Sequence, residues 1–327
     1  MNTDLHINPY RFRATTNDSF LLGSMNQVMQ LPKQPSLSIF EQGGFFGDFQ
    51  MAVLDLEQVD YLKRECFVVP FQIDDESRVS RQLGFFSLWE GDPLERQARL
   101  ERARVVILGV GTLGTQVSYM LASAGVGTLI LCDQDHVERS NLSRQMLFCD
   151  DDLGRPKVEA AKTRLLQTNP NINIEIHHCL LSSIDQIESL IIGSDLVIRA
   201  VDYPQDIAFT IDCACSRVGV PHIGAGLLET WTMVGPFIHS GQGPSLSDLI
   251  TPPTFTRSPY RRIPVFGPTS FWVASYVAGD ALRYLADLAT PWTLNRVIYL
   301  DGRTGQMFDH DLVKTHATRI TPEMEVA

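Results

Sequence analysis

One stretch, from Arg104 to Gln145, restricts the fold of this chain more than any other. It begins with an apolar run that is typical of a buried strand, and a turn follows with glycines at Gly109, Gly111 and Gly114. An amphipathic helix and a second apolar strand come next, and the second strand ends at Asp133. This order of strand, glycine turn, helix and strand with a terminal acidic residue is the pattern of a nucleotide-binding βαβ unit.

The rest of the chain continues to alternate between helix and strand patterns, which predicts the α/β class. We expect a Rossmann-like, doubly wound and mostly parallel sheet. Segment 235–268 is rich in glycine and proline and is expected to be irregular. The predicted helices lie at 115–124, 156–167, 183–191, 205–218 and 271–288, and the predicted strands at 105–108, 128–132, 172–177, 195–202, 221–225, 297–300 and 306–308.

Residues 1–72 are interpreted as a separate module. Short strand patterns precede a helix pattern that begins after Asp55, and this order predicts a winged-helix-like α+β module. Winged helices often bind DNA, but this module lacks a basic stripe. Residues 73–103 are interpreted as a polar linker followed by a charged entry helix, which leaves 104–327 for the main domain.

The composition excludes several classes of function. A formal net charge of −11 argues against binding to nucleic-acid backbones or anionic membranes. No apolar run approaches the roughly 20 residues of a membrane span, and the chain starts without a secretory signal pattern. The 6 cysteines form no CxxC pair, so we expect no zinc site, reduced thiols and a cytoplasmic location.

The residues around and after Asp133 distinguish between nucleotides. The turn that includes Thr112 and Leu113 exposes backbone N–H groups at a helix N-terminus, which favours phosphate. Asp133 is placed to accept hydrogen bonds from ribose hydroxyls. An NAD site needs no polar cluster near its phosphates, whereas a triphosphate needs groups that neutralise and orient it. The cluster comprises Asp135, Asn141, Arg144, Gln145 and Lys157. The sequence therefore predicts ATP.

Asp202 follows another buried strand pattern, at the edge of the sheet where ligands bind in open α/β folds. A carboxylate at this place is suited to hold Mg²⁺ together with ATP phosphates.

These motifs together resemble the ubiquitin-activating-like adenylating superfamily, which includes the molybdopterin and thiamin sulfur-carrier activators. The resemblance covers roughly Arg78 to Leu312, and its most specific segment is SNLSRQ. It implies that Asp133 binds ribose and that Asp202 serves Mg²⁺ and catalysis. It also implies that ATP phosphates are contacted by Asn141, Arg144, Gln145 and Lys157.

The same resemblance implies a homodimer. An Arg-x-x-Arg-Gln element precedes the domain in this superfamily, and Arg78, Arg81 and Gln82 match it. The second arginine of that element reaches into the ATP site of the partner subunit, so Arg81 is the candidate arginine finger.

A narrower resemblance concerns the peptide-modifying members, of the microcin C type and the pantocin A type. It rests on the small module before the adenylating domain and on segments such as QMLFCDDDLGRPK and VGPF. In such proteins the module is a winged-helix clamp for the leader of a ribosomally made precursor peptide. The leader usually docks there as an added strand, which would account for a winged helix without basic charge.

Three features depart from the superfamily pattern. Thr112 stands where the second glycine of the turn is usual, and the zinc cysteine pairs are missing. Without zinc, segment 235–268 needs another support. No cysteine falls at a thioester-forming position, since Cys213 and Cys215 lie in a predicted helix and are expected to pack in the core.

We therefore predict an enzyme that activates a carboxylate of a precursor peptide as an acyl-adenylate, leading to dehydration or cyclisation in the biosynthesis of a peptide antibiotic. The missing zinc cysteines favour activation of a glutamate side chain over the C-terminus, and an acyl phosphate stays open. The alternatives are adenylation of the C-terminus of a sulfur-carrier protein, an NAD-dependent oxidoreductase, and a non-catalytic peptide-binding adaptor.

Overall fold

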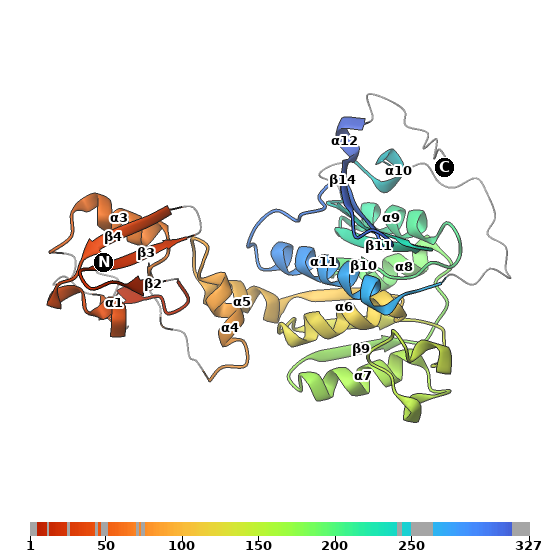
Figure 1. The fold of residues 1–327 in the computed structure, drawn as a ribbon. Helices are drawn as coiled ribbons and strands as arrows, with labels where there is room; N and C mark the ends of the chain where they lie inside the picture. The colour runs from red at the N-terminus through yellow and green to blue at the C-terminus, as the bar shows by residue number, and fades with distance from the viewer. Residues whose placement is uncertain are drawn as a thin grey trace. The chain divides into compact units, whose positions relative to one another are not determined.

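A computed structural model divides the chain into two compact units, Met1–Ala98 and Arg99–Ala327, and Figure 1 traces both from red to blue. No helix of the described part is long and apolar enough to cross a membrane. The structure describes residues 5–11, 13–24, 27–42, 45–46, 52–69, 72, 76–240, 244–249 and 264–315.

The centre of the second unit is a sheet whose described strands follow the order β14-β13-β12-β11-β10-β7-β8-β9. Neighbours from β9 to β11 pair in parallel, and the last three strands are antiparallel. The predicted Rossmann-like, mostly parallel α/β sheet is thus confirmed. The strands are β7 (Arg104–Leu108), β8 (Thr128–Cys132), β9 (Asn173–His177), β10 (Leu196–Arg199), β11 (His222–Leu228), β12 (Trp231–Ile238), β13 (Arg296–Asp301) and β14 (Met307–Asp311).

Helices cover both faces of this sheet (Figure 1). On one face lie α6, α7 and α11, and on the other lie α8 and α9. Because both faces are covered, β10 reads as a run of buried residues without alternation. The helices of this unit are α6 (Thr112–Ser123), α7 (Lys157–Thr168), α8 (Ile184–Ile191), α9 (Ile207–Val218), α10 (Leu246–Leu249), α11 (Gly267–Leu285) and α12 (Leu312–Thr315).

The described parts of segment 235–268 include a strand and a helix that the glycine and proline content did not predict. Strand β12 continues through Gly235 to Ile238 and pairs with both β11 and β13. Gly235 has φ +89°, and a Cβ there would lie 2.6 Å from the carbonyl oxygen of Arg296. The glycine is therefore required by a close approach inside the sheet and does not end the strand. Residues 241–243 and 250–263 of this segment lie outside the described residues.

The first unit combines short antiparallel strands with helices, which fits the predicted α+β character. Phe20 and Leu22 lie on the buried face of β3, and β3 forms a hairpin with β4. Two sheets have the orders β5-β1-β6 and β2-β3-β4. Their strands are β1 (Leu5–Ile7), β2 (Arg13–Thr15), β3 (Ser19–Ser24), β4 (Gln27–Pro32), β5 (Phe45–Phe46) and β6 (Val68–Val69).

The helix predicted after Asp55 is present as α3 (Leu56–Arg64). The Asp55 carboxylate accepts from the N–H of Gln58, whose side chain accepts from the N–H of Asp55, and this reciprocal pair is a capping box. Part of the expected linker is also helical. Leu83 and Phe86 are buried in α4 (Ser80–Phe86), and the charged entry helix follows as α5 (Pro93–Arg102). The short helix α1 (Ile39–Gln42) also belongs to this unit.

Candidate functional site

The turn between β7 and α6 lies where the order of the parallel strands reverses, since β8 and β10 flank β7 on opposite sides. Gly109 has φ +98°, and a Cβ there would lie 2.5 Å from the carbonyl oxygen of Ala200. A Cβ on Gly114 would lie 1.9 Å from the carbonyl oxygen of Gly109. Packing therefore requires both glycines. Gly111 faces open space, and Gln145 Nε2 lies 3.9 Å from where its Cβ would be.

The N-terminus of α6 opens toward this space. Gly111 occupies the N-cap position and has no side chain to cap the helix. Leu113 directs its side chain into the core, so it offers the site only its backbone N–H. Uncapped N–H groups in the first turn of a helix form a favourable binding place for phosphate.

Asp133 joins the glycine turn to the loop that follows β8. One carboxylate oxygen accepts from the N–H of Val110 at 2.6 Å, and the other accepts from the N–H of Asp135 at 2.8 Å. Each oxygen of an ionised carboxylate can accept a second hydrogen bond. Asp133 is half-buried and can therefore still accept from a ligand hydroxyl while it holds the turn.

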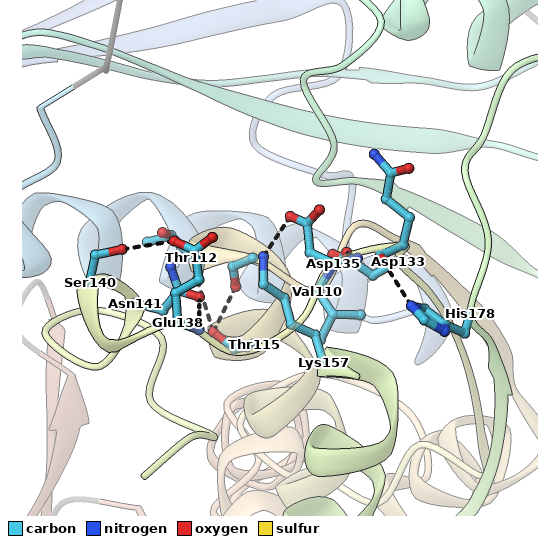
Figure 2. Close-up of polar contacts among 12 residues, drawn as sticks. Val110, Thr112, Thr115, Asp133, Asp135, Glu138, Ser140, Asn141, Lys157 and His178 are labelled. Atoms are coloured by element: carbon cyan, nitrogen blue, oxygen red, sulfur yellow. Dashed lines mark hydrogen bonds and ion pairs between the residues drawn. The ribbon is translucent and has the colours of Figure 1, made fainter. Parts of the chain in front are cut away.

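Lys157 reaches the same loop from the first residue of α7. Its Nζ donates to Asp135 Oδ2 at 2.8 Å, and its backbone N–H donates to the carbonyl of Asp135 at 2.9 Å. Figure 2 shows the ammonium group directed at this carboxylate. The Lys157 side chain is only 7% exposed, whereas that of Asp135 is 57% exposed. The site thus contains a buried cation whose counter-ion lies near the surface.

The predicted triad of Asn141, Arg144 and Gln145 comes from one short turn. Asn141 is buried, and its Oδ1 accepts from the N–H of Glu138 at 3.0 Å. Gln145 is also buried, and its Oε1 has no partner within the described residues. Arg144 Nε donates to Thr112 Oγ1 at 3.1 Å. The threonine that replaces the usual glycine is therefore a contact for Arg144 in this chain.

A cavity of about 480 Å³ lies beside these groups, within the size range of small-molecule sites. One part of its wall is held by His178, whose Nε2 hydrogen-bonds the carbonyl of Gln134 at 2.8 Å. The His178 ring also packs edge-on against His136. The sequence motifs did not point to these histidines. The cavity is lined by Gln134, Asp135, His136, Glu138, Asn141 and Lys157.

Asp202 lies three residues beyond the last residue of β10 and is exposed. The chain just before it contacts the glycine turn, because Ala200 and Val201 are the neighbours that a Cβ on Gly109 would strike. Within the described residues its carboxylate makes no hydrogen bond or ion pair, so it is available to a ligand. One free carboxylate beside a phosphate site fits Mg²⁺, which keeps several waters and binds through substrate phosphates.

Arg81 belongs to the first unit, on α4, where its guanidinium lies 5.8 Å from the ring centre of Tyr10. Its role across a subunit interface stays a prediction. Cys215 packs in the core between β10 and α9, and burial raises its pKa to about 12. Such a thiol is a poor nucleophile, in agreement with the expectation that it packs in the core.

A buried polar chain at the end of β10 was missed by the sequence analysis. Arg199 Nε donates to His222 Nδ1 at 2.8 Å, and His222 Nε2 donates to Asp212 Oδ1 at 2.9 Å. The same carboxylate oxygen accepts from the N–H of Leu246 at 3.0 Å. An arginine inside an otherwise apolar strand pattern was the signal that could have revealed it.

Comparisons with known proteins agree with this geometry. The model of the ThiF family matches residues 79–320. A molybdopterin-synthase adenylyltransferase of Haemophilus influenzae is 36% identical over 176 residues, which cover 54% of this chain and 70% of that protein. The sulfur carrier protein ThiS adenylyltransferase of Escherichia coli is 30% identical over 246 residues, which cover 71% of this chain and 89% of that protein.

Solved structures match over nearly the whole chain. E. coli MccB with MccA-N7isoASN has a TM-score of 0.80 at 22% identity, covering 94% of this chain and 96% of that chain. PaaA has a TM-score of 0.73 at 23% identity, covering 93% of this chain and 98% of that chain. At such identities these matches show the fold. Because the family model covers most of the chain and the relatives are adenylyltransferases, the chain belongs to the ThiF family and is an ATP-dependent adenylating enzyme.

Proposed function

We propose that this enzyme activates a carboxylate of a ribosomally made precursor peptide as an acyl-adenylate, in the biosynthesis of a peptide natural product. The observation that carries the proposal is the extent of the structural match. The ThiF family model begins at residue 79, but the MccB fold covers 94% of the chain and so includes most of the first unit. MccB has been solved in complex with N-formylated MccA, and a similar first unit supports a peptide substrate here.

The site geometry supports the following reaction. Asp133 accepts from ribose hydroxyls, and the N–H groups of α6 together with Arg144 and Lys157 hold the phosphates. The peptide carboxylate attacks the α-phosphorus, a new P–O bond forms, and the bond to the β-phosphate oxygen breaks with release of pyrophosphate. A nitrogen or carbon nucleophile of the peptide then attacks the acyl carbon and AMP leaves, so the net change is a dehydration or cyclisation.

Asp202 would hold Mg²⁺ in this site, with ATP phosphates as the other ligands. When bound, the ion neutralises charge on the departing phosphates. The other charged groups proposed to meet the phosphates are Arg144, which contacts Thr112, and Lys157, which pairs with Asp135 in the protein alone.

The first unit is proposed to bind the leader of the peptide. Strands β2 and β4 are the outer members of a three-stranded antiparallel sheet. An extended peptide can add to such an edge through main-chain hydrogen bonds, with its side chains read by neighbouring pockets. Truncation of residues 1–72 should abolish turnover of a leader-bearing peptide, while Asp202→Ala should abolish turnover and leave leader affinity intact.

Activity with a panel of substrates tests the function. ATP is incubated with candidate precursor peptides and, separately, with a ubiquitin-like sulfur-carrier protein, and the release of AMP, ADP and pyrophosphate is followed with the mass of the acceptor. AMP release that requires a leader-bearing peptide is the expected result. AMP release with the carrier protein alone would support the second candidate, which the names of the relatives favour. ADP would indicate an acyl phosphate, and hydride transfer with NAD would exclude both candidates.

A homodimer with Arg81 acting across the interface is part of the proposal. Arg81→Ala and Asp202→Ala are each expected to be inactive, because each removes one group from every site. In a 1:1 mixture of the two, one site of each mixed dimer has both residues, so about a quarter of wild-type turnover should return. Two inactive variants that stay inactive after mixing, despite exchange of subunits, would count against an arginine from the partner.

A further inference from the structure

The buried chain Arg199–His222–Asp212 begins at the carboxyl end of β10 and runs back along the sheet to His222, the first residue of the parallel strand β11. Arg199 is the last residue of β10 and is 9% exposed, and His222 and Asp212 are buried in β11 and α9. The Arg199 side chain packs against Gly224 of β11, where an added Cβ would be 2.9 Å from Arg199 Cζ. Charged groups are almost never buried in a central strand unless they are paired.

The pKa shifts of Arg199 and His222 are consistent with a guanidinium that is charged and held in one position. Burial lowers the pKa of Arg199 to about 10, so the guanidinium stays charged at neutral pH. Burial also lowers the pKa of His222 to about 4, so the imidazole is neutral and passes one hydrogen bond from Arg199 to Asp212. Arg199 Nη2 has no hydrogen-bond partner among the described residues. Burying a charged guanidinium costs desolvation free energy. If its role were only structural, an apolar side chain could fill the same space without that cost.

The hydrogen-bonded side chains Arg199, His222 and Asp212 are connected to the proposed nucleotide site through the residues that follow Arg199. The three residues after Arg199 are Ala200 and Val201, which abut Gly109, and then Asp202. The N–H of Ala200 donates to the carbonyl of Leu108, so this part of the chain is tied to the strand that enters the glycine turn. At its other end, Asp212 holds the N–H of Leu246 at the start of α10. One polar chain therefore joins the segment that leads to Asp202 with the segment that contains α10, which comes after the antiparallel strand β12.

We propose that Arg199 is a positioning residue: held through His222 by Asp212, it fixes residues 200–202 so that the Asp202 carboxylate meets Mg²⁺·ATP beside the glycine turn. The inference rests on the role proposed above for Asp202. It assigns no contact between Arg199 and the nucleotide, because the guanidinium is buried.

The test measures ATP affinity by calorimetry, with Mg²⁺ and with EDTA, so that it does not depend on turnover. In the wild type Mg²⁺ should strengthen binding. Arg199→Met should lose most of this gain, about ten-fold, while the affinity in EDTA stays within about two-fold. Gly224→Ala should have the same selective effect, because it displaces the guanidinium without removing a charge. His222→Gln keeps an acceptor and a donor and should retain the gain.

Arg217→Met on α9 is the matched control, because Arg217 pairs at the surface with Glu188 and should leave both affinities unchanged. Asp202→Asn must lose the Mg²⁺ gain; if it does not, the proposed role of Asp202 fails and this inference fails with it. If Asp202→Asn loses the gain but Arg199→Met and Gly224→Ala keep it, the positioning role alone is overturned. Equal loss with Mg²⁺ and with EDTA in the Arg199 variants would also overturn it, since that is a general effect on the fold.

Discussion

Lys157 holds its ammonium 2.8 Å from the carboxylate of Asp135 although only one of the two side chains is buried. The lysine is fixed by α7 and by its burial, whereas the exposed aspartate is free to turn toward solvent. An arriving phosphate can therefore take the place of the carboxylate without movement of the cation. On the proposed function, the protein alone therefore already holds in place the cation that would meet a phosphate.

The first prediction concerns this cation. Lys157→Met should weaken ATP binding about 30-fold, because a charge-assisted hydrogen bond contributes about 2 kcal/mol. Lys162→Met on the same helix removes an equal charge away from Asp135 and should leave the affinity unchanged. Calorimetric titration with ATP checks both variants, and equal effects of the two would indicate only the loss of net charge.

The second prediction separates ligand binding from stability at two similar aspartates. Asp133→Ala should weaken ATP binding about ten-fold or more. The substitution removes the acceptor for the N–H of Val110 in the glycine turn and the proposed acceptor for a ribose hydroxyl. Asp195 also accepts from a backbone N–H, that of Arg104 at 2.7 Å, but lies at the opposite edge of the sheet. Asp195→Ala should lower the free energy of unfolding by about 1 kcal/mol and leave ATP affinity intact.

A third prediction compares two glycines with positive φ. Gly154 has φ +82° and nothing near the place of a Cβ, so Gly154→Ala should cost about 1 kcal/mol of backbone strain. Gly109→Ala adds a Cβ 2.5 Å from the carbonyl of Ala200 and should cost about 3 kcal/mol or more. Denaturant unfolding measures both. Similar losses would mean that the turn can move away from β10.

Acid stability provides a fourth prediction. Burial lowers the pKa of His222 to about 4, below its unfolded value of 6.5. Between these pH values the unfolded chain takes up a proton that the folded chain does not, so stability is present above pH 6.5 and is lost toward pH 4. The loss is on the order of 3 kcal/mol. The pKa of Asp212 is also lowered: burial opposes the shift, but hydrogen bonds from His222 and Leu246 outweigh it.

His222→Gln removes the titrating group, so its free energy of unfolding should fall less steeply from pH 7 to pH 4 than that of the wild type. Urea unfolding at a series of pH values measures this slope. An unchanged slope would show that other groups dominate acid unfolding.

Local sequence patterns predicted the parts of this fold that depend on local physics. The apolar run of β7 and the glycine positions imply the βαβ unit, because only such a turn brings α6 back onto the strand. The loop with Asn141 and Arg144 was located correctly beside that turn. Contacts between residues that are distant in the sequence could not be predicted. Nothing in the pattern indicates that Arg199 hydrogen-bonds to His222, or that Arg144 contacts Thr112.

The predictions were wrong for two segments, in which tertiary packing outweighed the local preference of the residues. Gly235 permits close packing of β12 against β13, so it did not mark the end of a strand. The polar residues before Leu83 suggested a linker, but the two buried side chains that follow turn the segment into α4. Burial on one face outweighs average composition in so short a helix.

The three glycines of the turn have different surroundings, and this difference predicts how sequences derived from this enzyme diverge. Folding selects Gly109 and Gly114, because backbone occupies the place of their side chains. The side of Gly111 is open except for the amide of Gln145, so on the proposed function it is the nucleotide that requires this glycine. A gene duplicate that has lost its nucleotide but still folds should therefore diverge first at Gly111, and this single position would reveal a pseudoenzyme in a genome.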